Sequence, residues 1–266
     1  MNRPPETYRV YAIRYAHLDR FPPGKFLGGD PHETGAALDY FVWAVVSESQ
    51  SFIVDTGFDA EKARKRSRTI MHPVADGLNA IGIRPDAVEN IILTHMHYDH
   101  AGNSALFPRA RYHVQDREMA YCTGRCMCHD NLKHPFEADD VTSMVHRLFD
   151  GRVQFHDGES QITTGLSVHH VGGHTNGLQV VRVHTKRGWV VLASDASHYY
   201  ANMEGRQPFP AVYNVGDMME GHATCYRLAD SPQHVVPGHD PDVLKRYPAL
   251  SKETEGWIVS LDAEPR

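Results

Sequence analysis

The sequence predicts a protein of the α/β (α+β) class, in which β-sheets pack together and are flanked by helices. Two observations lead to this class. Runs rich in β-branched and aromatic residues, which are typical of strands, fall into two clusters, before residue 109 and after residue 150. Stretches with helical character lie between the runs and between the clusters. Sheets covered by helices accommodate this order of elements.

The first cluster begins with expected strands at residues 8–15 and 40–46. A third strand, 51–57, ends in Asp-Thr-Gly. A basic stretch, 61–80, is expected to form a helix with a solvated face. A turn or short helix then leads into a strand at 91–93. This part of the chain therefore alternates between strand and helix.

The second cluster follows a stretch, about 115–150, that is expected to be a helical insertion, with helices at 116–121 and 138–149. Strands are expected at 153–156, 167–171, 178–183, 189–193 and 234–236, and a late helix at about 216–229. No linker divides the chain, so residues 1–266 are expected to form a single domain.

Composition narrows the classes of function. Hydrophobic residues make up 41% and charged residues 23% of the 266 residues, as in an ordinary soluble enzyme. A net charge of −6 offers no basic surface for nucleic acid. We find no apolar leader and no run of the roughly 20 apolar residues that a bilayer span requires. We therefore expect a cytoplasmic protein that binds neither nucleic acid nor membrane.

The loop at 21–31 is too rich in proline and glycine for regular structure. Loops of this length commonly cover a site or contact a partner, and a homodimer is one arrangement that we consider. Several apolar residues near the motifs or in loops are candidates for a substrate pocket, with ordinary core packing as the alternative. These candidates are Phe26, Leu27, Tyr98, Met127, Phe136, Tyr199 and Phe209.

The segment His95-Met96-His97-Tyr98-Asp99-His100 is the strongest chemical signal in the chain. In extended backbone alternate side chains share a face, so His95, His97 and Asp99 can converge where the strand at 91–93 ends, and His100 can join them. On a helix, residues two apart would point about 200° apart. With 19 histidines present, H-x-H-x-D-H would arise by chance roughly once in a hundred such chains. The segment therefore predicts a metal site.

Three later positions complete this prediction, because each follows an apolar strand-like run. They are His174 after Gly172-Gly173, Asp195 after 189–193, and His239 after Pro237-Gly238. Imidazole and carboxylate ligands suit zinc, with iron, manganese and cobalt as alternatives.

With these residues the chain resembles the metallo-β-lactamase superfamily, whose ordered pattern of H-x-H-x-D-H, H, D and H is matched between residues 54 and 239. The resemblance implies an αββα sandwich of two mixed β-sheets with the metal site at the sheet edges. It implies two divalent metal ions, one held by His95, His97 and His174 and the other by Asp99, His100 and His239. Asp195 would bridge them.

Within the superfamily the chain is similar to the N-acyl homoserine lactonase group, through H-x-H-x-D-H-A-G at 95–102, Ala-Ser-Asp-Ala at 193–196 and the long N-terminal loop. The implied reaction is hydrolysis of a small lactone, the expected substrate partner. In that group a tyrosine stands three residues after the bridging aspartate, where this chain has His198. The expected catalytic residues are His198 or Tyr199, which stabilise the carbonyl oxygen, and Asp99, which assists proton transfer.

Other functions remain open at this point. Another cyclic ester, such as an aromatic lactone, and the thioesters hydrolysed by glyoxalase II-like enzymes would suit the same ligands. A β-lactamase usually lacks the bridging aspartate. Redox relatives hold a single iron or two irons on this fold, and the flavo-diiron proteins normally have glutamate at the position of His97. Retention of metal for structure alone is the non-enzymatic alternative.

The four cysteines are poorly arranged for disulfides, since Cys122, Cys126 and Cys128 lie together while Cys225 is distant. The spacing C-x3-C-x-C-H does not match the paired C-x-x-C spacing of common zinc sites. A structural or pocket-lining role is the first interpretation of this cluster, and a separate metal site is the alternative.

Overall fold

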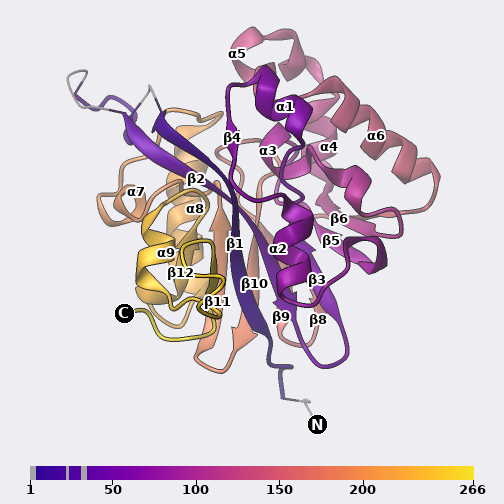
Figure 1. Ribbon diagram of the computed structural model, residues 1–266. Helices are drawn as coiled ribbons and strands as arrows, with labels where there is room; N and C mark the ends of the chain where they lie inside the picture. The colour runs from indigo at the N-terminus through magenta and orange to yellow at the C-terminus, as the bar shows by residue number, and fades with distance from the viewer. Residues whose placement is uncertain (1–3, 22–23, 31–34) are drawn as a thin grey trace.

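The computed structural model describes residues 4–21, 24–30 and 35–266. It consists of two mixed β-sheets that pack against each other and are covered by helices. This arrangement, visible in Figure 1, confirms the expected αββα sandwich. Residues 1–3 and the loop residues Pro22, Pro23 and Pro31 lie outside the described residues.

The first sheet has eight strands and contains both antiparallel and parallel pairs. Its order is β13-β1-β2-β3-β5-β6-β7, with β4 paired to β1, and the pairs from β3 through β7 are parallel. The strands are β1 (Arg9–Phe21), β2 (Ala36–Val46), β3 (Ser51–Val54), β4 (Thr69–Ile70), β5 (Asn90–Ile92), β6 (Arg111–Gln115), β7 (Val153–His156) and β13 (Ile258–Ser260).

The second sheet has five strands in the order β12-β11-β10-β9-β8. Only the β11–β12 pair is parallel among these described strands. The strands are β8 (Glu159–Thr163), β9 (Leu166–His170), β10 (Gln179–Thr185), β11 (Gly188–Ser194) and β12 (Val235–Pro237).

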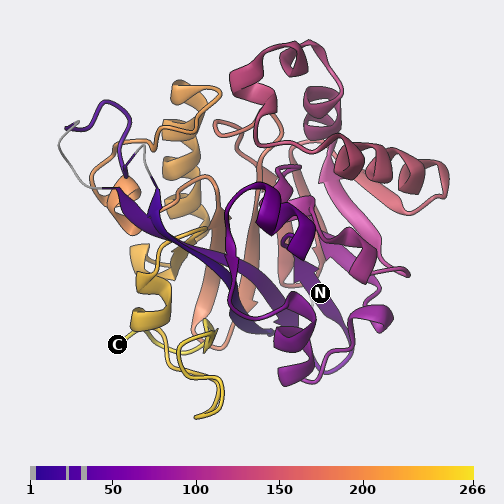
Figure 2. The same ribbon diagram turned by 45° about the horizontal axis from the view of Figure 1, so that its top comes forward.

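Helices cover the outer face of each sheet, as Figures 1 and 2 show. The helices are α1 (Ala60–Lys65), α2 (Val74–Ala80), α3 (Tyr98–Ala101), α4 (Asp116–Cys122), α5 (Asp130–Lys133), α6 (Ala138–Phe149), α7 (Tyr200–Glu204), α8 (Val215–Leu228) and α9 (Asp242–Arg246). Short 3-10 turns are η1 (Pro85–Ala87), η2 (Ser104–Leu106), η3 (Arg125–Cys128) and η4 (Pro232–His234). In the described part of the chain, none of the helices has the length and apolar character needed to cross a bilayer.

Strand β2 is buried on both faces and separates two layers of the hydrophobic core. Phe41, Trp43 and Val45 face the second sheet and pack in one cluster with Val181 and Leu192. The alternate residues of β2 lie in a separate cluster with residues of α2, α4 and α6. A strand covered on both faces reads as a continuous apolar run, which explains the strong signal at 40–46.

The expected helix at 61–80 is wrong as a single element. The segment forms α1 and α2, and the two-residue strand β4 lies between them and pairs with β1. The helix cannot continue through Ser67, whose φ is 53°, and Pro73 occupies the N-cap position of α2. Strands β8 and β13 are not among the expected strands, because β8 is polar and β13 is a short segment that forms by pairing with β1.

Candidate metal centre

The H-x-H-x-D-H segment begins in the loop after β5 and ends in the short helix α3. His97 precedes this helix with extended backbone, at φ −65° and ψ 153°. Strand β5 lies between β3 and β6 in the parallel part of the first sheet. The carboxyl ends of parallel strands meet at one edge, so the segment projects from that edge of the sheet.

The other three candidate ligands come from the second sheet. His174 lies in the connection between β9 and β10, Asp195 follows β11, and His239 follows β12. Because β11 and β12 are parallel neighbours, Asp195 and His239 emerge at the same edge. The two sheets therefore bring residues from distant parts of the chain together.

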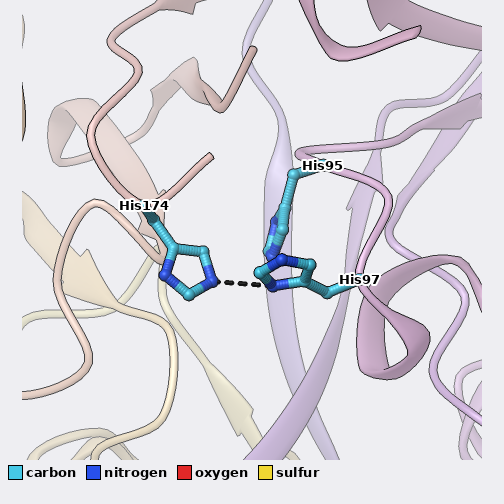
Figure 3. Close-up of side chains that lie close together, drawn as sticks. All are labelled: His95, His97 and His174. Atoms are coloured by element: carbon cyan, nitrogen blue, oxygen red, sulfur yellow. Dashed lines mark hydrogen bonds between the residues drawn. The ribbon is translucent and has the colours of Figure 1, made fainter. Parts of the chain in front are cut away.

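One cluster consists of His95, His97 and His174, whose candidate ligand nitrogens all lie within 4.8 Å of one another. His174 Nε2 is 2.8 Å from His97 Nδ1, the contact that Figure 3 marks with a dashed line. In Figure 3 the three imidazoles converge from two different segments of the chain. Three converging nitrogens are the ligand set expected of one metal ion.

The other cluster consists of Asp99, His100 and His239, which also meet within 4.8 Å. Asp99 Oδ2 is 3.7 Å from His100 Nε2 and 3.7 Å from His239 Nε2. The two imidazoles are buried, whereas the Asp99 side chain is partly exposed. This cluster therefore has one face open to a ligand.

Asp195 lies between the clusters and turns one oxygen toward each. Its Oδ2 is 3.2 Å from His174 Nε2, and its Oδ1 is 3.4 Å from His100 Nε2 and 3.1 Å from His239 Nε2. A carboxylate in this position can bind two ions at once.

Hydrogen bonds on the far side of the imidazoles set their orientation. His100 Nδ1 is 2.7 Å from Asp55 Oδ2, His239 Nδ1 is 2.9 Å from the carbonyl of Asp39, and His174 Nδ1 is 2.6 Å from the carbonyl of Ala211. An acceptor at Nδ1 holds the proton there and leaves Nε2 as the ligand atom. These three histidines are therefore oriented to bind through Nε2.

The donor atoms fit a pair of divalent metal ions. His95 Nε2, His100 Nε2 and Asp195 Oδ1 are buried without a hydrogen-bond partner among the described residues. Burial lowers the pKa of His95 and of His97 well below the ordinary value, so both imidazoles are neutral and can act as ligands. Unpartnered polar atoms are costly to bury, and a cation would satisfy all three.

A cavity of about 330 Å³ opens over the two clusters. It is lined by Leu38, Tyr40, Arg66, Arg68, His97, Tyr98, Asp99, Asn131, His134, Pro135, His174, Asp195, His198, Ala211 and His239. Among these, Tyr40, Arg66 and Arg68 were not singled out from the sequence. They lie far from the motif along the chain and carry no local signal of their own.

The side chains of His198 and Tyr199 lie in different surroundings. His198 lines the cavity with its Nε2 3.1 Å from Asp195 Oδ2, and its ring stacks on Phe209 at 3.4 Å between centroids. Burial lowers the pKa of His198 to about 4, so its imidazole is neutral at pH 7. The Tyr199 hydroxyl instead donates to the carbonyl of Ala37 at 3.1 Å. Tyr199 is not among the described residues that line the cavity.

The remaining pocket candidates have varied positions. Tyr98 lines the cavity, while Met127 and Phe136 line a neighbouring cavity of about 530 Å³ together with Cys122. Leu27 is partly exposed, and its backbone N–H donates to the carbonyl of Pro208 at 2.7 Å. The described part of the N-terminal loop therefore packs beside the segment that follows α7.

Glu118, on α4, is a buried acid that the sequence did not reveal. Its Oε1 accepts the N–H of Met96 at 2.8 Å, and its Oε2 accepts the hydroxyl of Thr175 at 2.6 Å and the N–H of Gly177 at 3.1 Å. Burial raises the pKa of Glu118 to about 7. Glu118 therefore links the loop that carries His95 and His97 to the loop that carries His174. Its surroundings come from other segments, so a helical pattern gives no sign of this role.

Comparison with known families agrees with this geometry. The family model described as the metallo-beta-lactamase superfamily matches residues 36–246. That range includes all seven candidate metal ligands and most of both sheets.

Curated relatives include a "Probable metallo-hydrolase" from Mycobacterium tuberculosis, which is 25% identical over 246 residues and covers 82% of this chain and 79% of its own. An N-acyl homoserine lactonase from a Bacillus species is 25% identical over 199 residues, covering 66% of this chain and 71% of its own.

Among solved structures, a quorum-quenching N-acyl homoserine lactone lactonase superposes with a TM-score of 0.71 at 20% identity, over 90% of this chain and 94% of its own. A probable metal-dependent hydrolase from Staphylococcus aureus gives a TM-score of 0.73 at 12% identity, over 99% and 96% of the two chains. At these identities the likeness is one of fold.

Proposed function

The chain belongs to the metallo-beta-lactamase superfamily, and from that premise we propose that it is a metal-dependent hydrolase that opens a small lactone ring. N-acyl homoserine lactones are the first substrate class to consider. The observation that carries the proposal is Asp195, which turns one carboxylate oxygen toward each of two ligand clusters. Such an arrangement suits two metal ions acting on one carbonyl group.

We assign His95, His97 and His174 to one ion, and Asp99, His100 and His239 to the other, with Asp195 shared. Zinc is the first choice for both. When bound, such a pair lowers the pKa of a shared water toward neutrality and polarises the substrate carbonyl, which is the chemistry that hydrolysis requires.

The chain's own side chains supply the remaining parts of the reaction. His198 is a neutral imidazole in the cavity wall outside both ligand clusters, so we assign it a hydrogen bond to the carbonyl oxygen as negative charge develops there. Tyr199 is the weaker choice because it is not among the described residues that line the cavity. The partly exposed carboxylate of Asp99 can take up the proton that the attacking water releases and pass it to the leaving ring oxygen.

Support for a lactone also comes from the relatives, because N-acyl homoserine lactonases are found among both the curated proteins and the solved structures that match this chain. Because the sequence identity to these relatives is low, they do not indicate which substituent the lactone ring carries. The cavity narrows the choice to a small molecule, since about 330 Å³ accommodates a lactone ring and a short substituent.

A substrate panel tests the proposal. Zinc-loaded protein is incubated with short and long N-acyl homoserine lactones, aromatic lactones and the thioester S-lactoylglutathione, and acid release is followed with a pH indicator. We expect turnover of at least one lactone class and little turnover of the thioester. A fully metallated sample that hydrolyses only the thioester would assign the protein to the glyoxalase II-like enzymes instead.

A further inference from the structure

Two arginines of the segment between α1 and β4 enter the cavity wall, and their surroundings differ. Arg66 is neutralised, because its Nε and Nη2 donate to Glu137 Oε1 at 2.9 and 2.7 Å. Its Nη2 also donates to the carbonyl of His134 at 2.7 Å, and its guanidinium lies 4.0 Å from the centre of the Tyr98 ring. Arg66 is therefore a fixed part of the wall.

Arg68 is held by neutral oxygens only. Its Nε donates to the Tyr98 hydroxyl at 3.1 Å, and its Nη1 donates to the carbonyl of Arg66 at 2.7 Å. In the described ranges, no carboxylate lies within ion-pair distance of its guanidinium, and Nη2 is not engaged. Asp99 is the carboxylate in the same wall, and it lies beyond that distance. Arg68 therefore presents a half-buried positive charge that has no direct ion pair with any described carboxylate, and Asp99 acts on it only at longer range.

The rest of the cavity does not supply the missing negative charge. Among the described lining residues the carboxylates are Asp99, which belongs to one ligand cluster, and Asp195, which is shared between the two. Asn131 and His134 line the wall as well. A positive charge held in a partly desolvated cavity is costly unless it pairs with an anion.

We propose that the substrate of this site carries a carboxylate in addition to its ester bond, and that Arg68 binds this carboxylate. The inference rests on the proposed ester hydrolysis at the same site. Because Nε and one N–H of Nη1 are engaged, the second N–H of Nη1 and the Nη2 group remain as donors for the two oxygens of a carboxylate. Arg68 is thus a specificity-determining residue that selects acidic lactones over neutral ones.

A matched pair of substrates tests the proposal with the zinc-loaded enzyme. N-hexanoyl homoserine lactone and N-adipoyl homoserine lactone have the same chain length and differ by a terminal methyl against a carboxylate. We expect kcat/KM to be at least about tenfold higher for the adipoyl compound, as one charge-assisted hydrogen-bond pair would produce. Added salt should reduce this preference.

Substitutions then assign the preference to Arg68. In Arg68→Gln the ratio of the two kcat/KM values should fall to near one through a higher KM for the adipoyl compound, and Arg68→Lys should retain part of it. The control Arg64→Gln removes an exposed arginine of the neighbouring α1 and should keep the wild-type ratio. A wild-type ratio near one, or an equal loss for both substrates in Arg68→Gln, would overturn the proposal.

A binding measurement separates this inference from the proposed function. Calorimetry compares linear dicarboxylates from succinate to suberate with monocarboxylates of the same carbon number, because both kinds can place one carboxylate at the metals. At least one dicarboxylate should bind about tenfold more tightly than its monocarboxylate, and Arg68→Gln should lose that gain. This result without lactone turnover would contradict the lactonase function alone. Equal affinities throughout the series would contradict the role of Arg68.

Discussion

At the scale of single residues, the site depends on which atoms each side chain turns toward its neighbours. Asp195 faces both ligand clusters, whereas His198 contacts Asp195 from the cavity wall. Glu118 touches neither cluster, yet it holds the loops that carry three of the histidines. We therefore expect a different consequence from substitution of each of these three residues.

Asp195→Asn should lose metal and activity together. The amide replaces one of the two ligand oxygens with a nitrogen donor, so metal content should fall below two ions per chain and kcat/KM should fall at least about 100-fold, since even residues that only orient ligands are worth 10- to 100-fold. Elemental analysis and lactone kinetics measure both effects. Full activity would exclude a shared carboxylate.

His198→Ala should separate catalysis from metal binding. Removal of a donor to the developing oxyanion is expected to lower kcat by about 100-fold, while two metals per chain remain. The same elemental analysis serves as the control. Loss of metal in this variant would show that His198 is itself a ligand, as its position beside His174 and Asp195 would allow.

Glu118→Gln should change how stability depends on pH. The pKa of Glu118 is raised by burial from 4.5 to about 7, so between these pH values the folded state keeps a proton that the unfolded state has lost. Stability from this group is therefore present below pH 4.5 and lost as pH rises through 7. Relative to the wild type, the glutamine variant should gain about 3 kcal/mol over that window.

Urea unfolding of both proteins at pH 4.5 and pH 8, with EDTA present, measures this difference. Glu48→Gln, at an exposed position, is the matched control and should show no such change. A constant difference between wild type and Glu118→Gln across the window would mean that Glu118 is ionised throughout.

At the scale of elements, the parallel pair β11–β12 brings Asp195 and His239 together. The loop after β12 passes so close to the loop after β11 that a Cβ on Gly238 would lie 2.7 Å from Asp195 Oδ1 and 2.7 Å from the Ser194 carbonyl carbon. Ser194 itself has a φ of 46°, in the left-handed region. The strand ends are therefore packed too tightly to admit any side chain between them.

Gly238→Ala should displace Asp195 and weaken metal binding. Forcing a methyl group into this contact is expected to cost about 1–3 kcal/mol of unfolding free energy and to reduce activity. Gly216→Ala is the control, because its Cβ would meet only the Asn214 side chain at 3.4 Å in the exposed first turn of α8. Thermal unfolding and metal analysis compare the two. Equal behaviour would show that the strand ends can relax.

At the scale of the whole molecule, the proposed metal pair joins the two sheets. His95, His97, Asp99 and His100 follow a strand of the first sheet, and the other candidate ligands follow strands of the second. The central core is likewise built from both sheets, which is why we propose that residues 1–266 form one domain. Binding of metal should therefore stabilise the molecule as a unit.

Removal of metal should lower the melting temperature. Ions present at about a thousand times their dissociation constants would contribute roughly 4 kcal/mol each, which corresponds to a fall of the order of 10 °C for a chain of this size. Calorimetry with and without EDTA, followed by zinc addition, measures the effect and its reversal. An unchanged melting temperature would contradict a pair of ions that joins both sheets.

Much of this protein could be predicted from local sequence. The strands at 40–46 and 153–156 and the helix at 138–149 are visible because their patterns are local and strong. The order H-x-H-x-D-H, H, D and H resembles the pattern of the superfamily, and each part of it stands just beyond an apolar strand-like run. The prediction of a single helix at 61–80 is wrong because β4 interrupts it, and β4 forms by pairing with the distant strand β1.

The sequence by itself determined the fold family and the candidate ligands, because both are visible as short local patterns that recur in a characteristic order along the chain. Only the tertiary structure decided the roles of Glu118, Arg68 and Tyr199. Glu118 is buried by other segments, and the hydroxyl of Tyr199 is bound by the carbonyl of Ala37. Arg68 contacts the distant Tyr98 but has no ion pair with a described carboxylate. Such contacts arise from packing between distant segments, which local pattern does not encode.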